Sequence, residues 1–387
     1  MAELAPMRPY ILYGVWSSYY TGKVRSYLRK KGLPFVERLP AAPEYRSDVR
    51  GKAGTHHIPV LVAPDGTVVQ DSTLILDYLE DRHPDPPMTP QTPVLRLAAM
   101  MLEVFGQEGL TRPAMHYRWS FLEENRDYIL HDFGRALKPR GTQAEIEAAG
   151  GMVAERMSGK LPGLGITEQT IPVVEAEFEA LLGLLDAHFG AHPYLLGGRP
   201  SRGDFGLMAP MFAHLSRDPY PAMVLRRHGP ATARWIEQMN VPELAMPEFE
   251  GLSPDYPPDD RPPETLLPVL RFFVETHGAE VAAIADSWAE WLQADPMRRP
   301  GTQISESAAA QPVLDPRPVR IRDTVFTISP RLHTLWMFQR PLDFFAAQTG
   351  PARAACEAFA AAIGAGQLLN LTLERPLRRD GGRLLVG

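Results

Sequence analysis

Residues 56–82, which read HHIPVLVAPDGTVVQDSTLILDYLEDR, hold the signals that decide the fold. A short apolar run from Pro59 to Ala63 is followed by a Pro64-Asp65-Gly66 turn and then by Thr67 to Gln70. Because Asp-Gly between two β-prone runs is a strong hairpin signal, the segment predicts two antiparallel strands. Asp71-Ser72 then stands where a helix should begin. One face of that helix carries Leu74, Ile75, Tyr78 and Leu79.

The chain before this stretch shows the same alternation of strands and helices. Residues 10–14 are a short strand that ends in glycine, and Lys23 to Lys31 is a helix with cationic residues in its last turn. Residues 34–39 are a second strand, and residues 43–57 leave room for one short helix. The order predicted for this part of the chain is β-α-β-α-β-β-α.

This order and the 56–82 stretch resemble the glutathione S-transferase superfamily, whose N-terminal domain has a thioredoxin-like fold. The resemblance implies that Ile58 presents its backbone to the cysteinyl part of glutathione, with a cis bond between Ile58 and Pro59. It also implies that Asp71 and Ser72 hold the γ-glutamyl end and that His57 reaches the glycyl end. The physical chemistry agrees, because a helix N-terminus offers N–H groups to a carboxylate and Asp71 can pair with the α-ammonium group. The alternative is an ordinary N-cap before an ordinary helix.

The loop after the first strand is where the family places its activating hydroxyl or thiol. The run Ser18-Tyr19-Tyr20-Thr21-Gly22-Lys23-Val24-Arg25 is similar to the serine-type pattern Ser-Pro-Phe-x-x-Lys-Val-Arg, except that Tyr19 replaces the proline. Ser18 is therefore the candidate catalytic residue, and the alternatives nearby are Ser17, Tyr19 and Tyr20. The structural alternative is a serine that only caps the helix containing Lys23.

The chemistry asked of Ser18 is modest. A free thiol titrates at about pH 8.5, so only about 3% is thiolate at neutral pH. A hydroxyl hydrogen bond to the charged sulfur contributes about 1.5–3 kcal/mol, which lowers the thiol pKa by about one to two units. The thiolate fraction then rises to between about a quarter and three quarters, so one well-placed hydroxyl is enough.

The composition excludes several other classes of protein. The chain has 387 residues, of which 44% are hydrophobic and 22% charged, as expected for a globular protein of two or three domains. A net charge of −6 argues against nucleic-acid binding. The single cysteine, Cys356, excludes a disulfide framework, a CxxC redox motif and a thiolate zinc site. With no signal peptide and no apolar run long enough to cross a membrane, we expect a cytoplasmic protein without a metal cofactor.

Helical periodicity dominates residues 94–240, which we expect to form the all-helical domain of the family, after a thioredoxin-like domain at residues 1–86. Helices are predicted over residues 94–118, 119–137, 145–158 (short and loosely packed) and 174–189. Ser201 and Asp204 form a capping box that begins a further helix, and Pro210 should kink that helix. In the family this Ser-x-x-Asp start has a structural role.

Residues 241–387 extend beyond the resemblance. Residues 241–263 contain seven prolines and are predicted to be a linker or a surface strap. Residues 264–387 match no motif, and their pattern predicts an α+β region of unknown role. Its expected elements are a helix over 264–293, a β-like run over 319–328, a helix over 331–345 broken near Pro341, a helix over 352–363, and a hairpin of residues 368–374 and 383–386 around Asp380-Gly381-Gly382.

The leading prediction is a glutathione S-transferase in which Ser18 favours the thiolate of glutathione and the sulfur attacks an apolar or aromatic electrophile. Conjugation, isomerisation and ether cleavage all begin with this nucleophile, and the sequence does not separate them. The alternative is a non-catalytic transferase scaffold that binds a partner protein through residues 264–387. A metal hydrolase built on His56 and His57 has little support, because no third ligand is evident nearby. The family commonly pairs through both domains, so we expect a homodimer.

Overall fold

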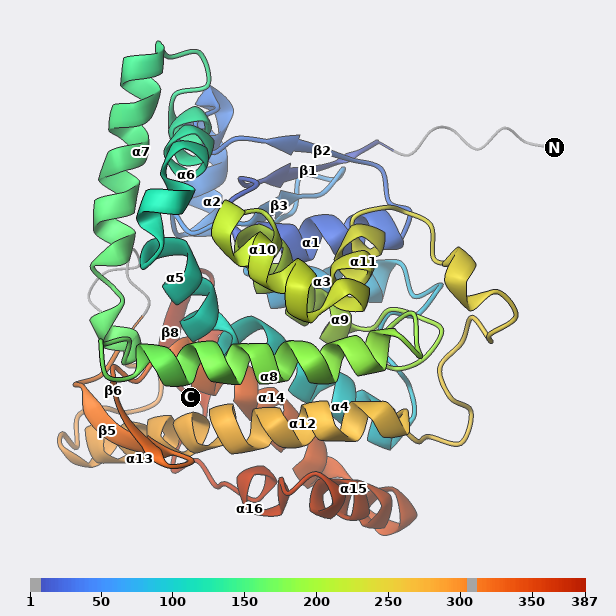
Figure 1. Ribbon diagram of the computed structural model, residues 1–387. Coiled ribbons are helices and arrows are strands. Elements are labelled where there is room, and N and C mark those ends of the chain that lie inside the picture. The colour runs from blue at the N-terminus through green and yellow to red at the C-terminus, as the bar shows by residue number, and fades with distance from the viewer. Residues whose placement is uncertain (1–7, 305–311) are drawn as a thin grey trace.

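The computed structural model describes residues 8–304 and 312–387. Its N-terminal region is a four-stranded mixed sheet with helices (Figure 1). The elements are β1 (Tyr10–Tyr13), α1 (Tyr19–Lys30), β2 (Phe35–Arg38), α2 (Arg50–Ala53), β3 (Val60–Val62), β4 (Val68–Gln70) and α3 (Ser72–Arg82). In the strand order β2-β1-β3-β4, β1 is parallel to β2 and antiparallel to β3, which pairs antiparallel with β4. The predicted thioredoxin-like order is confirmed.

Short-range signals set the ends of these elements. The Asp65-Gly66 turn joins β3 to β4, and Gly66 has φ 89°, a conformation that glycine adopts without a steric penalty. Ser18 caps α1, because its hydroxyl oxygen accepts a hydrogen bond from the Thr21 N–H at 3.3 Å. Asp71 caps α3 in the same way.

The register of the sheet brings three strand ends to one edge. Tyr13, the last residue of β1, is paired with Val60, the first residue of β3. Val60 is in turn paired with Gln70, the last residue of β4. The residues that follow β1, precede β3 and follow β4 therefore meet at this edge. We call it the site edge, because Ser18, Ile58 and Asp71 all belong to its connecting segments.

The next part of the chain is entirely helical (Figure 1). It comprises α4 (Pro93–Val104), α5 (Thr111–Trp119), α6 (Leu122–Leu137), α7 (Gln143–Ser158), α8 (Ile171–Phe189), α9 (Arg202–Pro210), α10 (Pro219–His228) and α11 (Pro230–Met239). The predicted helix over residues 119–137 was placed slightly early, since Trp119 ends α5 and α6 begins at Leu122. Pro210 closes α9, and a π-helical turn, Met211–Ser216, continues from it.

Helix α7 corrects a second expectation, because it is long and packs closely. It has 16 residues, and Gly150 lies where it crosses α6. A Cβ on Gly150 would lie 2.2 Å from the Leu130 carbonyl oxygen, and one on Gly134 of α6 would lie 2.0 Å from the Ile146 carbonyl oxygen. One glycine on each helix therefore allows the two backbones to pack closely.

Asp204 ties the start of α9 to the segment before it. Its two carboxylate oxygens accept hydrogen bonds from the Leu195 N–H at 2.9 Å, the Ser201 N–H at 2.8 Å and the Ser201 hydroxyl at 2.9 Å. Asp204 and Ser201 are fully buried, so water cannot replace these bonds. The carboxylate thus satisfies two main-chain donors in the core.

We expect Asp204→Ala to lower the free energy of unfolding by about 2–4 kcal/mol, because it leaves two buried N–H groups without an acceptor. Asp204→Asn keeps one acceptor oxygen and is expected to lose less. Urea denaturation followed by circular dichroism measures both variants. If Asp204→Ala lowered the free energy of unfolding by less than about 0.5 kcal/mol, the cap would contribute little to stability.

Residues 241–263 lie as a strap against the helical region. The Asp260 carboxylate accepts hydrogen bonds from the N–H groups of Val94 at 3.0 Å and Leu95 at 2.9 Å, and so caps α4 from a distant part of the sequence. The Tyr256 hydroxyl donates to the Pro200 carbonyl oxygen at 2.8 Å. The strap therefore contributes the cap that α4 lacks in its own sequence.

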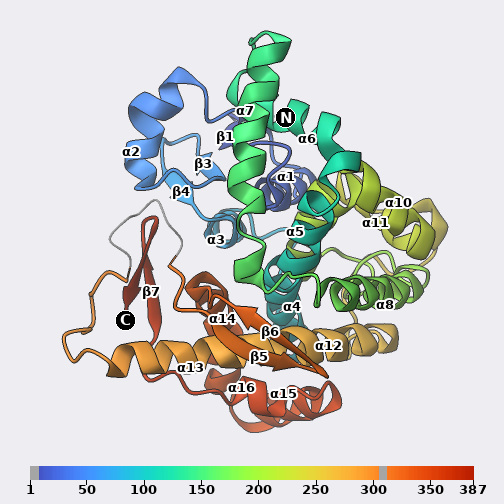
Figure 2. The same cartoon turned by 60° about the vertical axis from the view of Figure 1, so that its left-hand side comes forward.

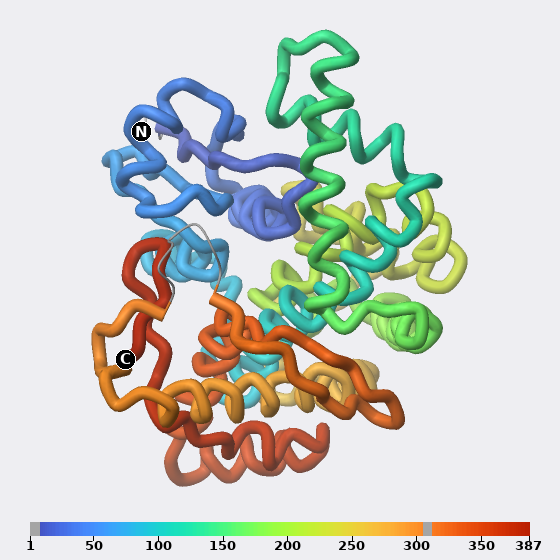
Figure 3. The backbone as a smooth tube through the Cα atoms, turned by 90° about the vertical axis from the view of Figure 1, so that its left-hand side faces the viewer, coloured from blue at the N-terminus to red at the C-terminus, as the bar shows by residue number. Residues whose placement is uncertain are grey.

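The C-terminal extension has the predicted α+β character, with two hairpins packed among helices. It contains α12 (Leu267–Phe273), α13 (Ala279–Gln293), β5 (Arg317–Ile321), β6 (Thr324–Ile328), α14 (Leu332–Ala347), α15 (Gly350–Ala362), α16 (Gly366–Leu369), β7 (Leu377–Asp380) and β8 (Arg383–Val386). Figures 2 and 3 show it, in orange and red, as a layer along one side of both the sheet and the helical region. A single cluster of buried apolar residues reaches from Tyr10 to Val386, so the extension shares its core with the rest of the protein.

Two expectations for the extension were wrong in detail. Helix α14 is not broken near Pro341 but continues to Ala347. The buried side chains Phe338, Leu342 and Phe345 favour the helix and offset the cost of the proline. The final hairpin forms around the predicted glycines, but its first strand begins at Leu377. Residues 368–374, expected in that strand, instead complete the short helix α16 and an irregular segment.

Candidate functional site

The loop after β1 and the start of α1 present four candidate hydroxyl groups in different environments. Ser18 is half-buried at the start of α1, whereas Ser17 is 2% exposed. The Tyr19 hydroxyl lies 2.9 Å from the Tyr20 hydroxyl, and the latter donates to Glu108 at 3.2 Å. Burial and the charge of Glu108 raise the pKa of both tyrosines, which keeps the phenols protonated. Of the four residues proposed from sequence, Ser17 and Tyr19 are buried, and Tyr20 is engaged with Glu108, which leaves Ser18 as the half-buried hydroxyl at the site edge.

Ile58 and Pro59 lead into β3 at the site edge. The peptide bond between them is cis, as the family resemblance implied. Pro59 is buried and Ile58 is half-buried. Within the described residues no hydrogen bond uses the N–H or the carbonyl group of Ile58. This backbone stands next to the start of β3, one strand away from the Ser18 loop.

Asp71 and Ser72 begin α3 at the same edge. Asp71 has φ 85°, a conformation that is rare for a residue with a Cβ and that is found at ligand-binding and switch regions. One oxygen of its carboxylate, Oδ1, accepts hydrogen bonds from the N–H groups of Thr73 at 2.9 Å and Leu74 at 3.5 Å. Asp71 is 5% exposed and Ser72 is 1% exposed. The N-terminus of α3 is thus covered in this structure.

The covering groups come from the extension, which the sequence had not connected with this site. Arg379 Nη1 lies 3.0 Å from Asp71 Oδ2, and Arg379 Nη2 donates to Gln70 Oε1 at 2.8 Å. His333 Nε2 lies 3.9 Å from the same Asp71 oxygen. Burial opposes ionisation of Asp71, but the charge of Arg379, with those of His333 and Lys23, outweighs it and holds the pKa of Asp71 below its usual value. Asp71 is therefore a buried, paired carboxylate.

Glu108 connects the Ser18 loop to the extension. It is 2% exposed, and it accepts hydrogen bonds from the Tyr20 hydroxyl at 3.2 Å and the Thr334 hydroxyl at 2.9 Å. Arg331 Nη1 lies 3.4 Å from its second oxygen. Arg331 also faces Glu280 at 3.6 Å. The wall behind the site is therefore a chain of paired charges rather than an apolar surface.

Lys23, which matches the lysine of the serine-type pattern, is a structural residue here. It is fully buried, and its ammonium group donates to Glu103 at 2.6 Å and to Thr73 and Gln107 at 2.8 Å. These bonds hold α1, α3 and α4 together beneath the site edge. Burial lowers the pKa of Lys23, and the nearby carboxylate of Glu103 opposes that shift.

His57 lies just before Ile58, and its ring is largely buried. Its Nδ1 atom is 2.9 Å from the Thr55 hydroxyl. Burial first, and then the neighbouring His56 and Arg379, lower the pKa of His57 to about 4. The ring is therefore neutral at pH 7, so it can donate a hydrogen bond to a ligand carboxylate but carries no positive charge for it.

One family model matches the N-terminal region. Residues 12–87 match the family model described as the glutathione S-transferase N-terminal domain. This part of the chain belongs to the glutathione S-transferase superfamily. The matched range contains the Ser18 loop, the cis bond at Ile58–Pro59 and the start of α3, which are the features that meet at the site edge.

Curated relatives match about a quarter of the chain. A probable maleylacetoacetate isomerase from Caenorhabditis elegans is 28% identical over 102 residues, which are 26% of this chain and 47% of the relative. A glutathione S-transferase from Triticum aestivum is 36% identical over 88 residues, 23% of this chain and 40% of the relative. A maleylacetoacetate isomerase from Dictyostelium discoideum is 27% identical over 103 residues, 25% and 47% of the two chains. The chain spans less than half the length of these relatives.

Solved structures of glutathione transferases also match. One from Phanerochaete chrysosporium is 20% identical with a TM-score of 0.44, covering 62% of this chain and 98% of its own. One from Methylobacterium radiotolerans, solved in complex with glutathione sulfonate, is 25% identical with a TM-score of 0.35, covering 62% and 93%. Each match leaves more than a third of this chain uncovered.

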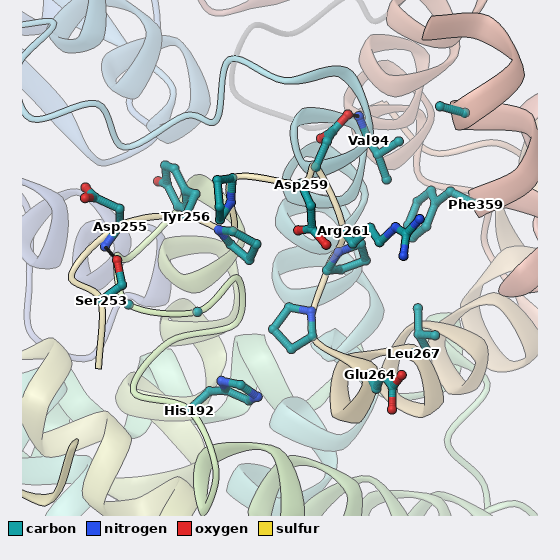
Figure 4. Close-up of a pocket in the computed structure, with 18 of the residues that line it drawn as sticks. Val94, His192, Ser253, Asp255, Tyr256, Asp259, Arg261, Glu264, Leu267 and Phe359 are labelled. Atoms are coloured by element: carbon teal, nitrogen blue, oxygen red, sulfur yellow. Dashed lines mark hydrogen bonds between the residues drawn. The ribbon is translucent and has the colours of Figure 1, made fainter. Parts of the chain in front are cut away.

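A groove lies away from the site edge. It has a volume of about 910 Å³ and lies between the strap, the start of α4 and α15 (Figure 4). Its labelled residues include the carboxylates Asp255, Asp259 and Glu264, with Arg261 between them in the strap. None of the three residues that define the site edge lines this groove.

Two features are absent from the described part of the chain. Within residues 8–304 and 312–387, no three or more His, Cys, Asp or Glu side chains are grouped so that they could hold a metal ion. In the same part of the chain, no helix has the length and apolar character needed to span a bilayer.

Proposed function

We propose that this chain is a glutathione-dependent enzyme that binds the tripeptide along the site edge and activates its thiol with Ser18. The observation that carries the proposal is the register of the sheet, in which Tyr13, Val60 and Gln70 are paired in a row. This row places the Ser18 loop, the Ile58 backbone and the N-terminus of α3 at one edge. A γ-glutamyl thiol can use each of these three groups. The hydroxyl can donate to its sulfur, the N–H and carbonyl groups of Ile58 can pair with its main chain, and the helix N-terminus can bind its carboxylate.

Each end of glutathione has a partner of suitable chemistry in this arrangement. The γ-glutamyl carboxylate would accept from the Ser72 N–H at the start of α3, and its α-ammonium would pair with Asp71. The cysteinyl main chain would pair with the N–H and carbonyl groups of Ile58 beside Pro59. The glycyl carboxylate would accept a hydrogen bond from the neutral ring of His57.

Ser18 is the best candidate for the group that stabilises the thiolate. Its hydroxyl oxygen accepts the Thr21 N–H bond, which leaves the hydroxyl proton to be donated to the ligand sulfur. Ser17 is buried, and its main-chain carbonyl accepts from Arg118 at 3.1 Å. The Tyr19 phenol is directed towards Tyr20 and Thr111 and not towards the edge. We therefore propose Ser18 as the catalytic residue. It would stabilise the thiolate of glutathione, and the thiolate sulfur would then attack an apolar or aromatic electrophile.

We expect Ser18→Gly to raise the pKa of enzyme-bound glutathione by about one to two units and to lower the rate at pH 7 by about tenfold. Glycine is the informative replacement, because at an N-cap it costs only a few tenths of a kcal/mol. The thiolate absorbance of bound glutathione, followed against pH, measures the shift. Ser17→Ala is the control and should leave the titration unchanged. The reverse pattern would assign the role to Ser17.

Glutathione-dependent isomerisation is a second candidate, favoured by the two relatives that are named maleylacetoacetate isomerases. In an isomerisation the thiolate adds to a carbon–carbon double bond and then leaves, so glutathione is recovered. In a conjugation a carbon–sulfur bond remains and glutathione is consumed. Counting free thiol before and after complete turnover separates the two. Constant thiol with product formed supports the isomerase, and loss of one thiol per product supports the transferase.

A cytoplasmic location and a homodimer are part of the proposal. A non-catalytic scaffold that binds a partner through residues 264–387 is the competing proposal, favoured by the contacts that the extension makes with Asp71. Binding of glutathione without turnover on a broad panel of electrophiles would support the scaffold. Sedimentation of the purified protein as a monomer would contradict the dimer.

A further inference from the structure

The hairpin β7–β8 closes the γ-glutamyl end of the site edge. Both oxygens of the Asp71 carboxylate are in use: Oδ1 accepts from the start of α3, and Oδ2 faces Arg379 at 3.0 Å. Only 6% of the Asp71 side chain and 5% of the Arg379 side chain are exposed. Arg379 also donates to Gln70, the residue next to Asp71. A ligand from solvent therefore cannot reach this carboxylate while the hairpin stays in place.

The base of the hairpin is anchored in the core. Leu377 and Val386, which are paired with each other, are buried, and the Leu377 N–H donates to the Gln339 side chain at 2.7 Å. The Val386 N–H donates to the Thr302 carbonyl oxygen at 2.9 Å. These contacts fix the end of the hairpin that lies away from the site edge.

The tip of the hairpin, residues 379–383, contacts the site edge through the polar bonds of Arg379 to Asp71 and Gln70. It is formed by the register pairs Arg379–Leu384 and Asp380–Arg383, with Gly381 at the turn. Gly382 packs so closely on the loop before Ile58 that a Cβ on it would lie 2.5 Å from the Thr55 Cβ. Asp380, Gly381 and Arg383 are exposed. A short two-stranded tip of this kind has little stability of its own.

The guanidinium group of Arg379 stands where the proposed ligand would place a cation. The α-ammonium of a γ-glutamyl group and the guanidinium carry the same charge and require the same carboxylate oxygen. The two cations repel each other, and the nearly complete burial of Asp71 and Arg379 leaves the ammonium group no path to this oxygen while the guanidinium stays in place. Exchange of one cation for the other keeps Asp71 paired, so opening the tip does not leave an isolated buried charge when the ligand is present.

Resting on the proposed function, we infer that Arg379 is an internal competitor for the γ-glutamyl ammonium group of glutathione. The tip of the hairpin is a latch: it is closed when Arg379 pairs with Asp71 and opens when the ligand takes that place. The anchored base lets the tip move without unfolding the extension. If the closed form holds about 90% of the molecules, the apparent affinity for glutathione is about tenfold weaker than that of the open form.

The opposite role for Arg379 makes the opposite prediction. An arginine that stays in place and pairs with the γ-glutamyl carboxylate would strengthen binding, so its removal would weaken it. The sign of the change therefore decides between a competitor and a ligand-binding residue. The matched control is Arg378→Gln. Arg378 precedes Arg379 in the same strand and is exposed, and its substitution removes the same charge.

Titration calorimetry with glutathione on the wild type, Arg379→Gln and Arg378→Gln is the experiment. We expect Arg379→Gln to bind about tenfold more tightly and Arg378→Gln to match the wild type. Equal or weaker binding by Arg379→Gln, with a wild type that binds, overturns the latch and leaves the proposed function standing. No binding by the wild type or by either variant overturns the proposed function and the latch together.

Hydrogen exchange on the wild type gives a readout that does not depend on a variant that folds. With glutathione added, we expect the amides of residues 379–383 to exchange faster, while those of Leu377 and Val386 stay protected. Slower exchange at the tip would show that the hairpin closes on the ligand and would contradict the latch. Unchanged exchange, with glutathione bound, would contradict it as well.

Discussion

Asp71→Asn is expected to weaken glutathione binding by about 100-fold or more. The substitution removes the charge that would pair with the ligand ammonium group in a buried place, and loss of one member of such a pair costs about 2–5 kcal/mol. Asparagine is as good an N-cap as aspartate, so the start of α3 should persist. Calorimetry on the wild type and the variant measures the loss.

The control for this substitution is Asp65→Asn. Asp65 lies in the β3–β4 turn of the same domain, where it is exposed and its carboxylate accepts from the Thr67 N–H at 2.9 Å. Asp65→Asn removes the same charge as Asp71→Asn but lies away from the site edge, so glutathione binding should be unchanged. Equal binding by Asp71→Asn and the wild type would mean that the ligand ammonium does not meet Asp71.

Glu280→Ala is expected to lower the free energy of unfolding by about 3–5 kcal/mol. Glu280 is 6% exposed on α13, and its carboxylate faces Arg112 at 2.8 Å and Arg331 at 3.6 Å. Removing it leaves two largely buried guanidinium groups without this partner, which is among the most destabilising changes a core can suffer. Chemical denaturation gives the free energy directly.

The same helix offers a matched control. Glu290 faces Arg317 at 3.4 Å, but its side chain is 71% exposed. Glu290→Ala should therefore change stability by no more than about 0.5 kcal/mol. If Glu280→Ala had an effect as small as this, the extension would not depend on the ion pairs that join it to the helical region.

The sequence predicted the site edge because the signals involved are local. The Asp65-Gly66 turn sets the β3–β4 pairing within a few residues, and Asp71 caps the helix that follows it directly. Ser18 likewise accepts a hydrogen bond from the N–H group of Thr21, three residues further along the chain. The predicted order of elements and the capping box at Ser201 rest on such short-range rules, whereas the cis bond at Ile58–Pro59 was expected from the resemblance to glutathione transferases.

The contacts of Arg379 were not predictable in this way. Arg379 and Gln70 are 309 residues apart, and nothing near Arg379 distinguishes it from Arg378, which is exposed. Strand alternation alone would have left open which of the two faces the sheet. Local rules also failed at Pro341. They predict a break in the helix there, but burial of the neighbouring side chains keeps α14 intact. The division into domains stays a prediction.

The central claim is that a γ-glutamyl thiol binds along the edge where Ser18, Ile58 and Asp71 meet. Calorimetric titration of the purified full-length protein with glutathione tests it most directly. The account predicts a heat of association that saturates at one glutathione per chain and is lost in Asp71→Asn. A titration with no heat of association in the wild type at millimolar glutathione, or equal binding by the variant, would contradict it.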